Sequence, residues 1–554
     1  MMTHTDNKPP QTRIVLSIIC VIILSVIAWV GFDETAHAQT VGKWRRHVVS
    51  ITGSVSGNPF ETIVDAVFTH TSGTRIKLPG YYDGNHTWRF GFMPTQIGTW
   101  TWRTISSQSS LDGKTGSLTA VASGHPGLLK ADPAHPRKWK YEDGPYVVPI
   151  GVFVNAMLDN ASDSQFTEMA DFLKSNNFQL INFRISEHDR AFSNVFRREM
   201  HLDRWRRLER RMEILTVRGL GVEIMLYTDD AGSPSFGPKS ATEQLLIRYT
   251  VARLAGYPVV LFNSGIDIGE YRTGDWATWY GQQVRSQDSY GHPVSSRFKL
   301  ESNWPRMDGE TYTSDGQRNS VLSIMLDAYH RKNIPAINTD NFSEDRTAGI
   351  NAHTRDDIRR AAWKGVVVGG VGFHIRDKDT FCPSGITECD QYFRVTEVAQ
   401  SLDAAPWIRL VNPFVQSRLG STFGTMTYTA SLVSNGHALA DPHRTKIMYL
   451  LMGRHDTWDS SQPEANRIVH FIRSALCSVF PTEQCKNEFE QARQDDGNAV
   501  TVKFGDLSGS YAAAWLNPRT GQETNAGPLA AGQNHVMTPP SDPHNDWILL
   551  LEKM

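Results

Sequence analysis

The sequence predicts an α/β protein with a (β/α)8 TIM barrel, flanked by an N-terminal β-sandwich and a C-terminal β domain. Three observations support this prediction. Short, partly alternating segments separated by Gly, Pro and Asn fill residues 40–125, as in a small sandwich. Strand-like and helical patterns then alternate through residues 140–420, and eight such strands are the number that closes a barrel. Residues 425–554 return to β patterns, interrupted by a helical insertion at about 460–496.

The sandwich is predicted from five strand-like segments, namely HVVSITGSV, TIVDAVFTH, TRIKLPGYYDG, HTWRFGFMP and GTWTWRTIS. The Pro- and Gly-rich stretch ASGHPGLLKADPAHPRKW that follows is typical of a linker.

The barrel is predicted from eight strand-like segments, namely YVVPIGVFV, QLINFRIS, GVEIMLYT, PVVLFNSG, VSSRFKL, GETYTS, IPAINTDN and VGFHIRD. Helical patterns separate most of them, such as SQFTEMADFLKSNN, DRWRRLERRMEILTVRG, ATEQLLIRYTVARLAG and SVLSIMLDAYHRKN. A doubly wound open sheet is the alternative, but no G-x-G-x-x-G motif follows the first strand.

The N-terminus predicts export. Basic residues precede the apolar run IVLSIICVIILSVIAWVGF, and the sequence AHA ending at Ala38 supplies a small-x-small cleavage pattern. We therefore expect a signal peptide over residues 1–38 and a secreted or periplasmic protein of a bacterium. An uncleaved membrane anchor at residues 14–32 is the alternative, because the apolar run is long enough to span a bilayer. We expect no other membrane contact.

The cysteines agree with export. Beyond the predicted signal peptide they form two local pairs, CPSGITEC and CSVFPTEQC. An even number with short spacing in an exported chain predicts two disulfide bonds, Cys382–Cys389 and Cys477–Cys485. A zinc site built from all four is the alternative, but no C-x-x-C motif occurs. We expect no metal and no cofactor.

The overall charge and the aromatic content bear on the partner. The formal net charge is −2 without long basic or acidic runs, which gives little support to nucleic-acid binding. Aromatic residues make up 10% of the chain, including 15 Trp, and such a content fits a carbohydrate substrate.

Barrel enzymes carry their chemistry at the carboxyl ends of the strands, where loops leave the core. Applied to the eight predicted strands, this rule selects a set of polar residues that lie at or just after the strand ends. The candidate catalytic residues are Asp267 and Asp340. The candidate substrate-binding residues are Arg184, Glu187, His188, Tyr227, Asn263, Glu270, Tyr312, Glu344 and His374.

The proposed catalytic pair follows the fourth and seventh strands. Asp267 and Asp340 both sit in Gly- or Asn-containing turns directly after buried runs. Two facing carboxyl groups, one protonated and one ionised, are what cleavage of a glycosidic bond requires. Aspartates at strand ends are also common helix N-caps, and we favour that explanation for Asp229, Asp275 and Asp345.

Three parts of the chain resemble known families. NPFETIVDAVFTHTSGTRIKLPGYYDGNHTWRFGFMPTQIGTWTWRTISSQSSLDGKTGSL resembles the uncharacterised sandwich domain that precedes many bacterial glycoside-hydrolase barrels. WKYEDGPYVVPIG resembles the entry to an apiosidase-like barrel. HALADPHRTKIMYLL and YAAAWLNPRTG, with DWILLLEK, resemble a C-terminal β domain that is labelled collagen-binding, and a fold resemblance does not transfer that function.

The resemblance to apiosidase-like enzymes implies roles for two residues. Their acid/base is an Asp that closes a G-G-D turn after strand four, and SGID places Asp267 there. Their nucleophile is an acidic residue in a P-v-l-d-g-E pattern after strand seven, and PAINTD places Asp340 there. The chain departs from the pattern with Asp instead of Glu at 340 and with Ile266 instead of a small or polar residue. These departures point to altered substrate geometry, to a transfer of the role to Glu344 or Glu270, or to lost activity.

The expected function is therefore that of a secreted, retaining glycoside hydrolase that degrades a polysaccharide or oligosaccharide. A non-catalytic carbohydrate-binding protein on the same barrel scaffold is the alternative.

Overall fold

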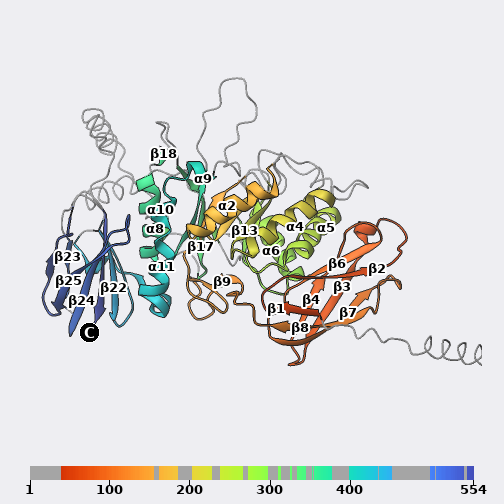
Figure 1. The fold of residues 1–554 in the computed structure, drawn as a ribbon, viewed down its shortest axis with the longest axis horizontal. Coiled ribbons are helices and arrows are strands. Elements are labelled where there is room, and N and C mark those ends of the chain that lie inside the picture. Colours follow the sequence, from red (N-terminus) through yellow and green to blue (C-terminus); the bar gives the residue numbers. More distant parts are fainter. Residues whose placement is uncertain are drawn as a thin grey trace, which may run out of the picture.

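The computed structural model describes residues 39–154, 161–184, 202–227, 237–265, 272–296, 310–312, 325–326, 333–344, 352–353, 355–376, 398–434, 436–451, 500–505, 507–541 and 546–554. They form three β-containing parts that follow one another along the chain (Figure 1). The predicted signal peptide, the predicted helical insertion and all five cysteines lie outside the described residues. Within the described residues, no helix is long and apolar enough to cross a membrane.

The N-terminal part consists of two β-sheets, with strand orders β1-β8-β7-β3-β4 and β2-β6-β5. Their elements are β1 (Gln39–Gly42), β2 (His47–Thr52), η1 (Pro59–Glu61), β3 (Val64–His70), β4 (Arg75–Pro79), β5 (Tyr81–Tyr82), β6 (Thr87–Phe92), β7 (Gly98–Ser106) and β8 (Thr115–Val121). Alternate residues of β3 are buried, because successive side chains of a strand point to opposite faces. Trp88 and Trp100 are fully buried, in a core that continues into the central part of the protein.

The central part is built on a parallel sheet, preceded by the hairpin of β9 (Leu129–Ala131) and β10 (Trp139–Tyr141). The strand order is β15-β14-β13-β12-β11-β19-β17-β16, with β18 paired to β17. The strands are β11 (Ile150–Phe153), β12 (Leu180–Arg184), β13 (Gly221–Tyr227), β14 (Val260–Gly265), β15 (Val294–Ser295), β16 (Glu310–Tyr312), β17 (Ala336–Glu344), β18 (Ala352–His353) and β19 (Gly372–Arg376). Each predicted barrel segment contains one of these strands, and β17 extends beyond its segment to Glu344.

The order of these strands is that of a barrel opened at one junction. The first strand, β11, pairs with the last, β19, in a register that places Ile150 opposite Phe373. The two ends of the hydrogen-bonded path, β15 and β16, are successive strands in the chain. The protein is therefore a mixed α/β protein with a parallel half-barrel sheet between two β parts, and full closure at this junction stays a prediction.

Helices follow the parallel strands and cover the sheet. They are α2 (Asp163–Ser175), α4 (Leu202–Thr216), α5 (Ala241–Leu254), α6 (Gly274–Gln287), α8 (Arg355–Val368), α9 (Val398–Ser401), α10 (Ala405–Ile408) and α11 (Val411–Phe414). Hydroxyl side chains start three of them, since Ser162, Ser240 and Thr273 each accept a hydrogen bond from a backbone N–H of the first turn. Asp275, which we expected to cap a helix, lies in the first turn of α6 behind the Thr273 cap.

The C-terminal part is a six-stranded sheet of order β20-β21-β22-β27-β24-β25 beside a two-stranded sheet of β23 and β26. It follows the short helices η4 (Val415–Leu419) and η5 (Gly420–Gly424) and includes the short helix η6 (Ala430–Leu432). Its strands are β20 (Thr427–Tyr428), β21 (His437–Ala440), β22 (Lys446–Leu451), β23 (Val500–Val502), β24 (Ser510–Leu516), β25 (Glu523–Ala530), β26 (His535–Met537) and β27 (Trp547–Lys553).

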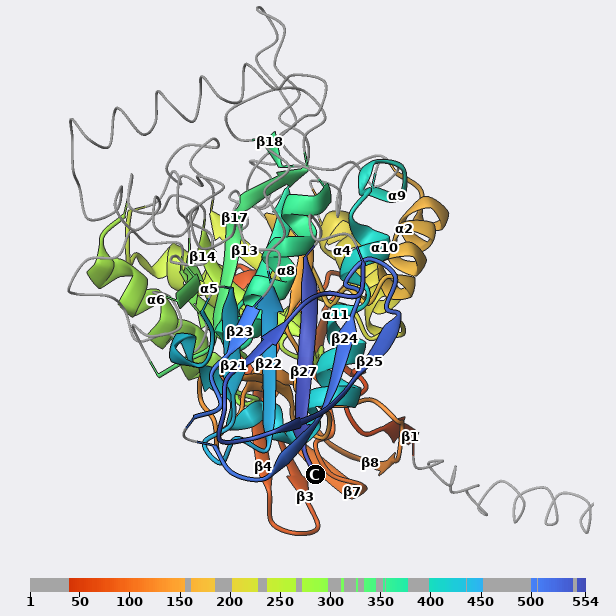
Figure 2. The ribbon, with the colours of Figure 1, turned by 90° about the vertical axis from the view of Figure 1, so that its left-hand side faces the viewer.

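Helix α8 lies between the parallel sheet and the C-terminal sheet (Figures 1 and 2). Every residue from Ile358 to Val368 is buried, so the helix has no solvent-facing polar side. Its Arg359 guanidinium binds the buried Asp546 carboxylate at the start of β27, with Nε donating to Oδ2 over 3.0 Å. This ion pair connects the central and C-terminal parts.

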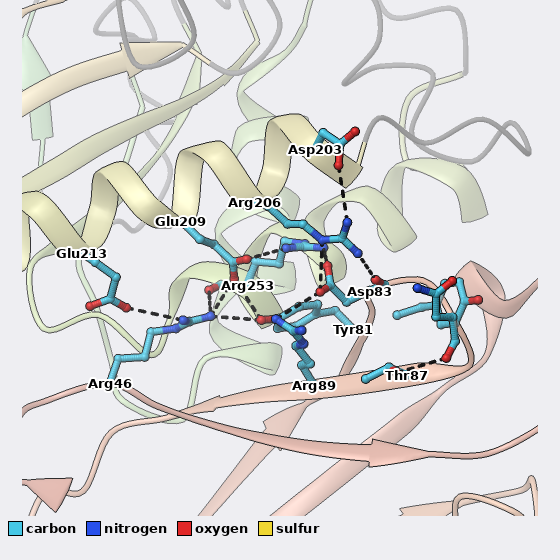
Figure 3. Close-up of polar contacts among 12 residues, drawn as sticks. Arg46, Tyr81, Asp83, Thr87, Arg89, Asp203, Arg206, Glu209, Glu213 and Arg253 are labelled. Carbon is cyan, nitrogen blue, oxygen red and sulfur yellow. Dashed lines mark hydrogen bonds and ion pairs between the residues drawn. The ribbon is translucent and has the colours of Figure 1, made fainter. Parts of the chain in front are cut away.

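A network of buried charges joins the N-terminal sandwich to helices α4 and α5 (Figure 3). The Arg253 guanidinium of α5 donates to Glu209 of α4 and to Asp83 of the sandwich, each over 2.6 Å. Arg46 of the sandwich donates to the other oxygen of Glu209, also over 2.6 Å. Because Arg253 and Asp83 have no exposed side-chain surface, each charge depends on its partner in place of water.

We expect the substitution Asp83→Asn to destabilise the protein by about 3–5 kcal/mol, because it removes one partner of a buried ion pair. Urea denaturation would measure the loss. Asp203→Asn is the matched control, since Asp203 is exposed and lies 3.4 Å from Arg206 of the same network, and an exposed pair contributes less than about 1 kcal/mol. Equal losses for the two variants would contradict the importance of the buried pair.

Lys138 connects the central part to the C-terminal part. Its buried ammonium donates to the carbonyl oxygens of Gly369, after α8, and Met426, before β20, each over 2.8 Å. The same ammonium lies 4.5 Å from the centre of the Phe423 ring. Burial, together with the nearby Arg137, lowers the pKa of Lys138 from 10.5 to about 7.

Replacing Lys138 by Met is expected to change the pH dependence of stability. Between a folded-state pKa of about 7 and the ordinary 10.5, the unfolded chain binds more protons at this position than the folded chain. The unfolding free energy of the wild type should therefore rise with pH across this window relative to that of K138M. Urea melts of both proteins at several pH values would test this, and parallel curves would contradict it.

Candidate active site

Five buried polar side chains gather on one face of the parallel sheet, most of them near the middle of their strands. They come from β12, β13, β14, β15 and β19, and are Asn182, Glu223, Asn263, Ser295 and His374. We call this group the Glu223 cluster. Burial of polar and charged groups is unfavourable unless they bind one another, and the contacts within the cluster meet that requirement.

Both oxygens of the Glu223 carboxylate accept hydrogen bonds. Oε1 accepts from Nδ2 of Asn263 over 2.7 Å and from Oγ of Ser295 over 3.2 Å. Oε2 accepts from Nδ2 of Asn182 over 3.1 Å. Bonds to a carboxylate are stronger than bonds between neutral groups, so this side chain ties three strands together on the inner face of the sheet.

Asn263 relays the contact to the end of β14. With its Nδ2 directed at Glu223, its Oδ1 accepts a hydrogen bond from the backbone N–H of Gly265 over 3.0 Å. Gly265 has a φ of +149°, a conformation that favours glycine. A Cβ at this position would lie 2.6 Å from the carbonyl oxygen of Tyr227, so the last residue of β14 must be a glycine.

His374 reaches the cluster from β19, across strand β11. Its Nδ1 lies 3.5 Å from Oε2 of Glu223, and its ring stands edge-on to that of Phe153. β11 leaves room for the imidazole because residue 151 is a glycine. A Cβ on Gly151 would lie 2.8 Å from Nε2 of His374.

A second buried group lies between the end of β13 and helices α5 and α6. Glu243 of α5 accepts hydrogen bonds from the Tyr227 hydroxyl over 2.9 Å and from Nε1 of Trp276 over 3.1 Å. Burial and the adjacent Glu243 carboxylate hold the pKa of Tyr227 well above its usual value. The phenol therefore stays protonated and keeps donating to Glu243. Arg272, where the described chain resumes after β14, lies 3.8 Å from Glu243.

The predicted site residues fall into three sets. Asn263 and His374 meet in the Glu223 cluster, whereas Tyr227 is buried and bound to Glu243. Four residues are placed by their strands alone, and these are Arg184 in β12, Tyr312 in β16, and Asp340 and Glu344 in β17. Four lie outside the described residues, namely Glu187, His188, Asp267 and Glu270.

The strand-end rule missed the centre of the cluster. Glu223 lies four residues before the end of β13, and Asn182 and Ser295 were not selected either. A sequence signal for Glu223 exists, because it is the one charged residue of the apolar run GVEIMLY. Among the described residues, no group of three or more His, Cys, Asp or Glu side chains is arranged to hold a metal ion.

Comparisons of sequence identify the two flanking parts. Residues 40–107 match the family described as "Domain of unknown function (DUF5060)". Residues 480–552 match the family described as "Putative collagen-binding domain of a collagenase". These matches confirm the N-terminal and C-terminal resemblances seen in the sequence. No curated protein matches the chain.

Solved structures with the same fold match between 77% and 93% of this chain. A "putative glycoside hydrolase" from Bacteroides vulgatus is 15% identical, with a TM-score of 0.67 over 93% of this chain and 100% of its own. A family 5 glycoside hydrolase from the same organism is 13% identical, with a TM-score of 0.56 over 77% of this chain and 94% of its own. A third structure, named "Glycoside hydrolase", is 12% identical, with a TM-score of 0.55 over 77% and 97%. At these identities the similarity is one of fold.

We expect Gly151→Ala to destabilise the protein by about 1–3 kcal/mol, since the added methyl group must displace the His374 ring. Gly237→Ala is the matched control, because no atom of the described residues lies within 4 Å of a Cβ built there. Thermal denaturation of both variants would measure the difference. A Gly151→Ala protein as stable as the control would contradict the close packing of His374 on β11.

Proposed function

We propose that the protein is an exported glycoside hydrolase that cleaves a polysaccharide or oligosaccharide at the carboxyl ends of the parallel strands. The observation that supports this best is the strand order, in which the first and last parallel strands pair and the path ends at two strands successive in the chain. The order is that of a (β/α)8 barrel, whose active sites lie at the carboxyl ends of its strands. Three structures of this fold are named as glycoside hydrolases, and one of them matches this chain over its own full length.

In the proposed reaction, Asp267 acts as acid/base and Asp340 as nucleophile. Protonated Asp267 donates its proton to the glycosidic oxygen while Asp340 attacks the anomeric carbon, forming a covalent glycosyl-enzyme and releasing the leaving sugar. Asp267, now ionised, then takes a proton from water, which attacks the anomeric carbon, frees Asp340 and retains the configuration. No metal or cofactor takes part in this mechanism.

The positions of the two aspartates in the chain support these roles. Asp267 follows β14 by two residues. Asp340 lies in β17 where the pairing with β19 shifts register, between Asn338 and Phe342. Such irregularities are frequent next to active sites. Assignment to the apiosidase-like enzymes rests on the sequence resemblance. The signal peptide and the disulfide bonds rest on sequence patterns.

Product analysis on a panel of plant pectins and bacterial surface polysaccharides would identify a substrate and test the proposal. Asp267→Asn is expected to lower kcat by about 10²- to 10⁴-fold, because it removes the general acid. Asp340→Ala is expected to abolish turnover, and azide should restore part of it by replacing the nucleophile. Asp275→Asn is the matched control and should leave kcat unchanged, since Asp275 is exposed in the first turn of α6.

Two outcomes would contradict the proposed function. Glycan binding by the wild type without any product would favour a non-catalytic carbohydrate-binding protein. Full activity of both Asp267→Asn and Asp340→Ala would move the chemistry to other residues.

A further inference from the structure

The geometry of the Glu223 cluster points to a function for this buried carboxylate beyond the catalytic pair. We infer that Glu223 is a positioning residue, which orients the Asn263 carboxamide and thereby fixes the end of strand β14. The inference rests on the proposed function, because Asp267 follows this strand end by two residues. Glu223 itself is buried in the middle of β13.

The first step of the argument is the orientation of Asn263. A carboxylate only accepts hydrogen bonds, so Glu223 must face the NH2 group of Asn263, which lies 2.7 Å from its Oε1. The carbonyl oxygen of the same amide then faces the N–H of Gly265, at 3.0 Å. A neutral side chain at position 223 that both donates and accepts hydrogen bonds would allow either orientation of the Asn263 carboxamide.

The second step concerns the strand end itself. The N–H of Gly265 is bound by Asn263, and Gly265 pairs with Tyr227 of the neighbouring strand β13. The Tyr280 hydroxyl of α6 also donates to the carbonyl oxygen of Asn263, over 3.2 Å. The direction in which the chain leaves β14 is therefore set by contacts to two neighbouring elements, and the contact through Asn263 depends on Glu223.

The third step is the cost of the arrangement. A buried carboxylate often contributes less to stability than a well-packed apolar side chain of similar size at the same position. Glu223 is nevertheless bound by groups from β12, β14 and β15, with His374 of β19 close by. Four strands that approach one charge make a rigid arrangement, and rigid support is what a catalytic group requires to keep its geometry.

Glu223→Gln tests the inference with little change of shape. The substitution replaces one acceptor oxygen by an NH2 donor. Because Asn263 and Ser295 donate to one oxygen and Asn182 to the other, the new donor meets a donor in either orientation. Where it meets Asn263, that amide must rotate, and its bond to the Gly265 N–H is lost.

We expect two results for Glu223→Gln. Hydrogen exchange of the Gly265 amide, followed by mass spectrometry of overlapping peptides, should become faster by about an order of magnitude. On the glycan identified by the panel, kcat should fall by about 10- to 100-fold with KM nearly unchanged, because the reacting group is misplaced while the sugar still binds. Asn263→Ala should give the same exchange result, and the double variant should add nothing to it.

Glu209→Gln is the matched control, since Glu209 is also a buried carboxylate. It lies on α4 at the interface with the sandwich, and its partners are arginines. It should lower stability without changing Gly265 exchange or kcat. If Glu223→Gln does not fold, Asn263→Ala alone tests the same contact.

Unchanged Gly265 exchange in Asn263→Ala would overturn the inference, as would unchanged exchange in Glu223→Leu, which offers the Asn263 amide no acceptor in any orientation. Faster exchange with an unaltered kcat would overturn it too. The exchange measurement does not require turnover, so failure of the inference is distinguishable from failure of the proposed function. If the wild type binds glycan without cleaving it, the proposed function fails, and the exchange of the Gly265 amide alone then decides the inference.

Discussion

The carboxylate of Glu223 is a charge held away from water in the middle of a parallel sheet, and the local structure is arranged to bind it. Its hydrogen-bond donors come from three strands, and a histidine from a fourth lies beside it. Two glycines serve the same arrangement, since Gly151 makes room for His374 and Gly265 accepts the conformation that ends β14. The sheet at the candidate site thus depends on satisfying one buried charge.

The parts that flank the sheet follow the same physical rule on a larger scale. Buried ion pairs fasten α4 and α5 to the sandwich through Arg253, and fasten α8 to the C-terminal sheet through Arg359. The apolar core also runs without a break from the sandwich into the central part. The flanking β parts are therefore joined to the central part by buried ion pairs, and the sandwich also shares its apolar core.

Much of the fold followed from sequence, because the periodicity of apolar residues is a local property. The eight parallel strands and helices α2, α4 and α5 are confirmed where the patterns predicted them. Helix α8 was not among the helical segments named from the sequence, and its residues from Ile358 to Val368 are buried between the two sheets. The strand-end rule found Asn263 and His374 but not Glu223, whose partners are brought together by the folded sheet and lie up to 151 positions away in the chain.

The separation of the Asp267 and Asp340 carboxyl groups in an experimentally determined structure of the wild-type protein tests the central claim most directly. Asp267 follows by two residues the end of β14, a strand of the Glu223 cluster, and Asp340 lies within β17. The account predicts a separation of about 5 to 5.5 Å across a common cleft, as a retaining mechanism requires. Carboxyl groups more than about 12 Å apart, beyond the geometry of either a retaining or an inverting enzyme, would contradict it.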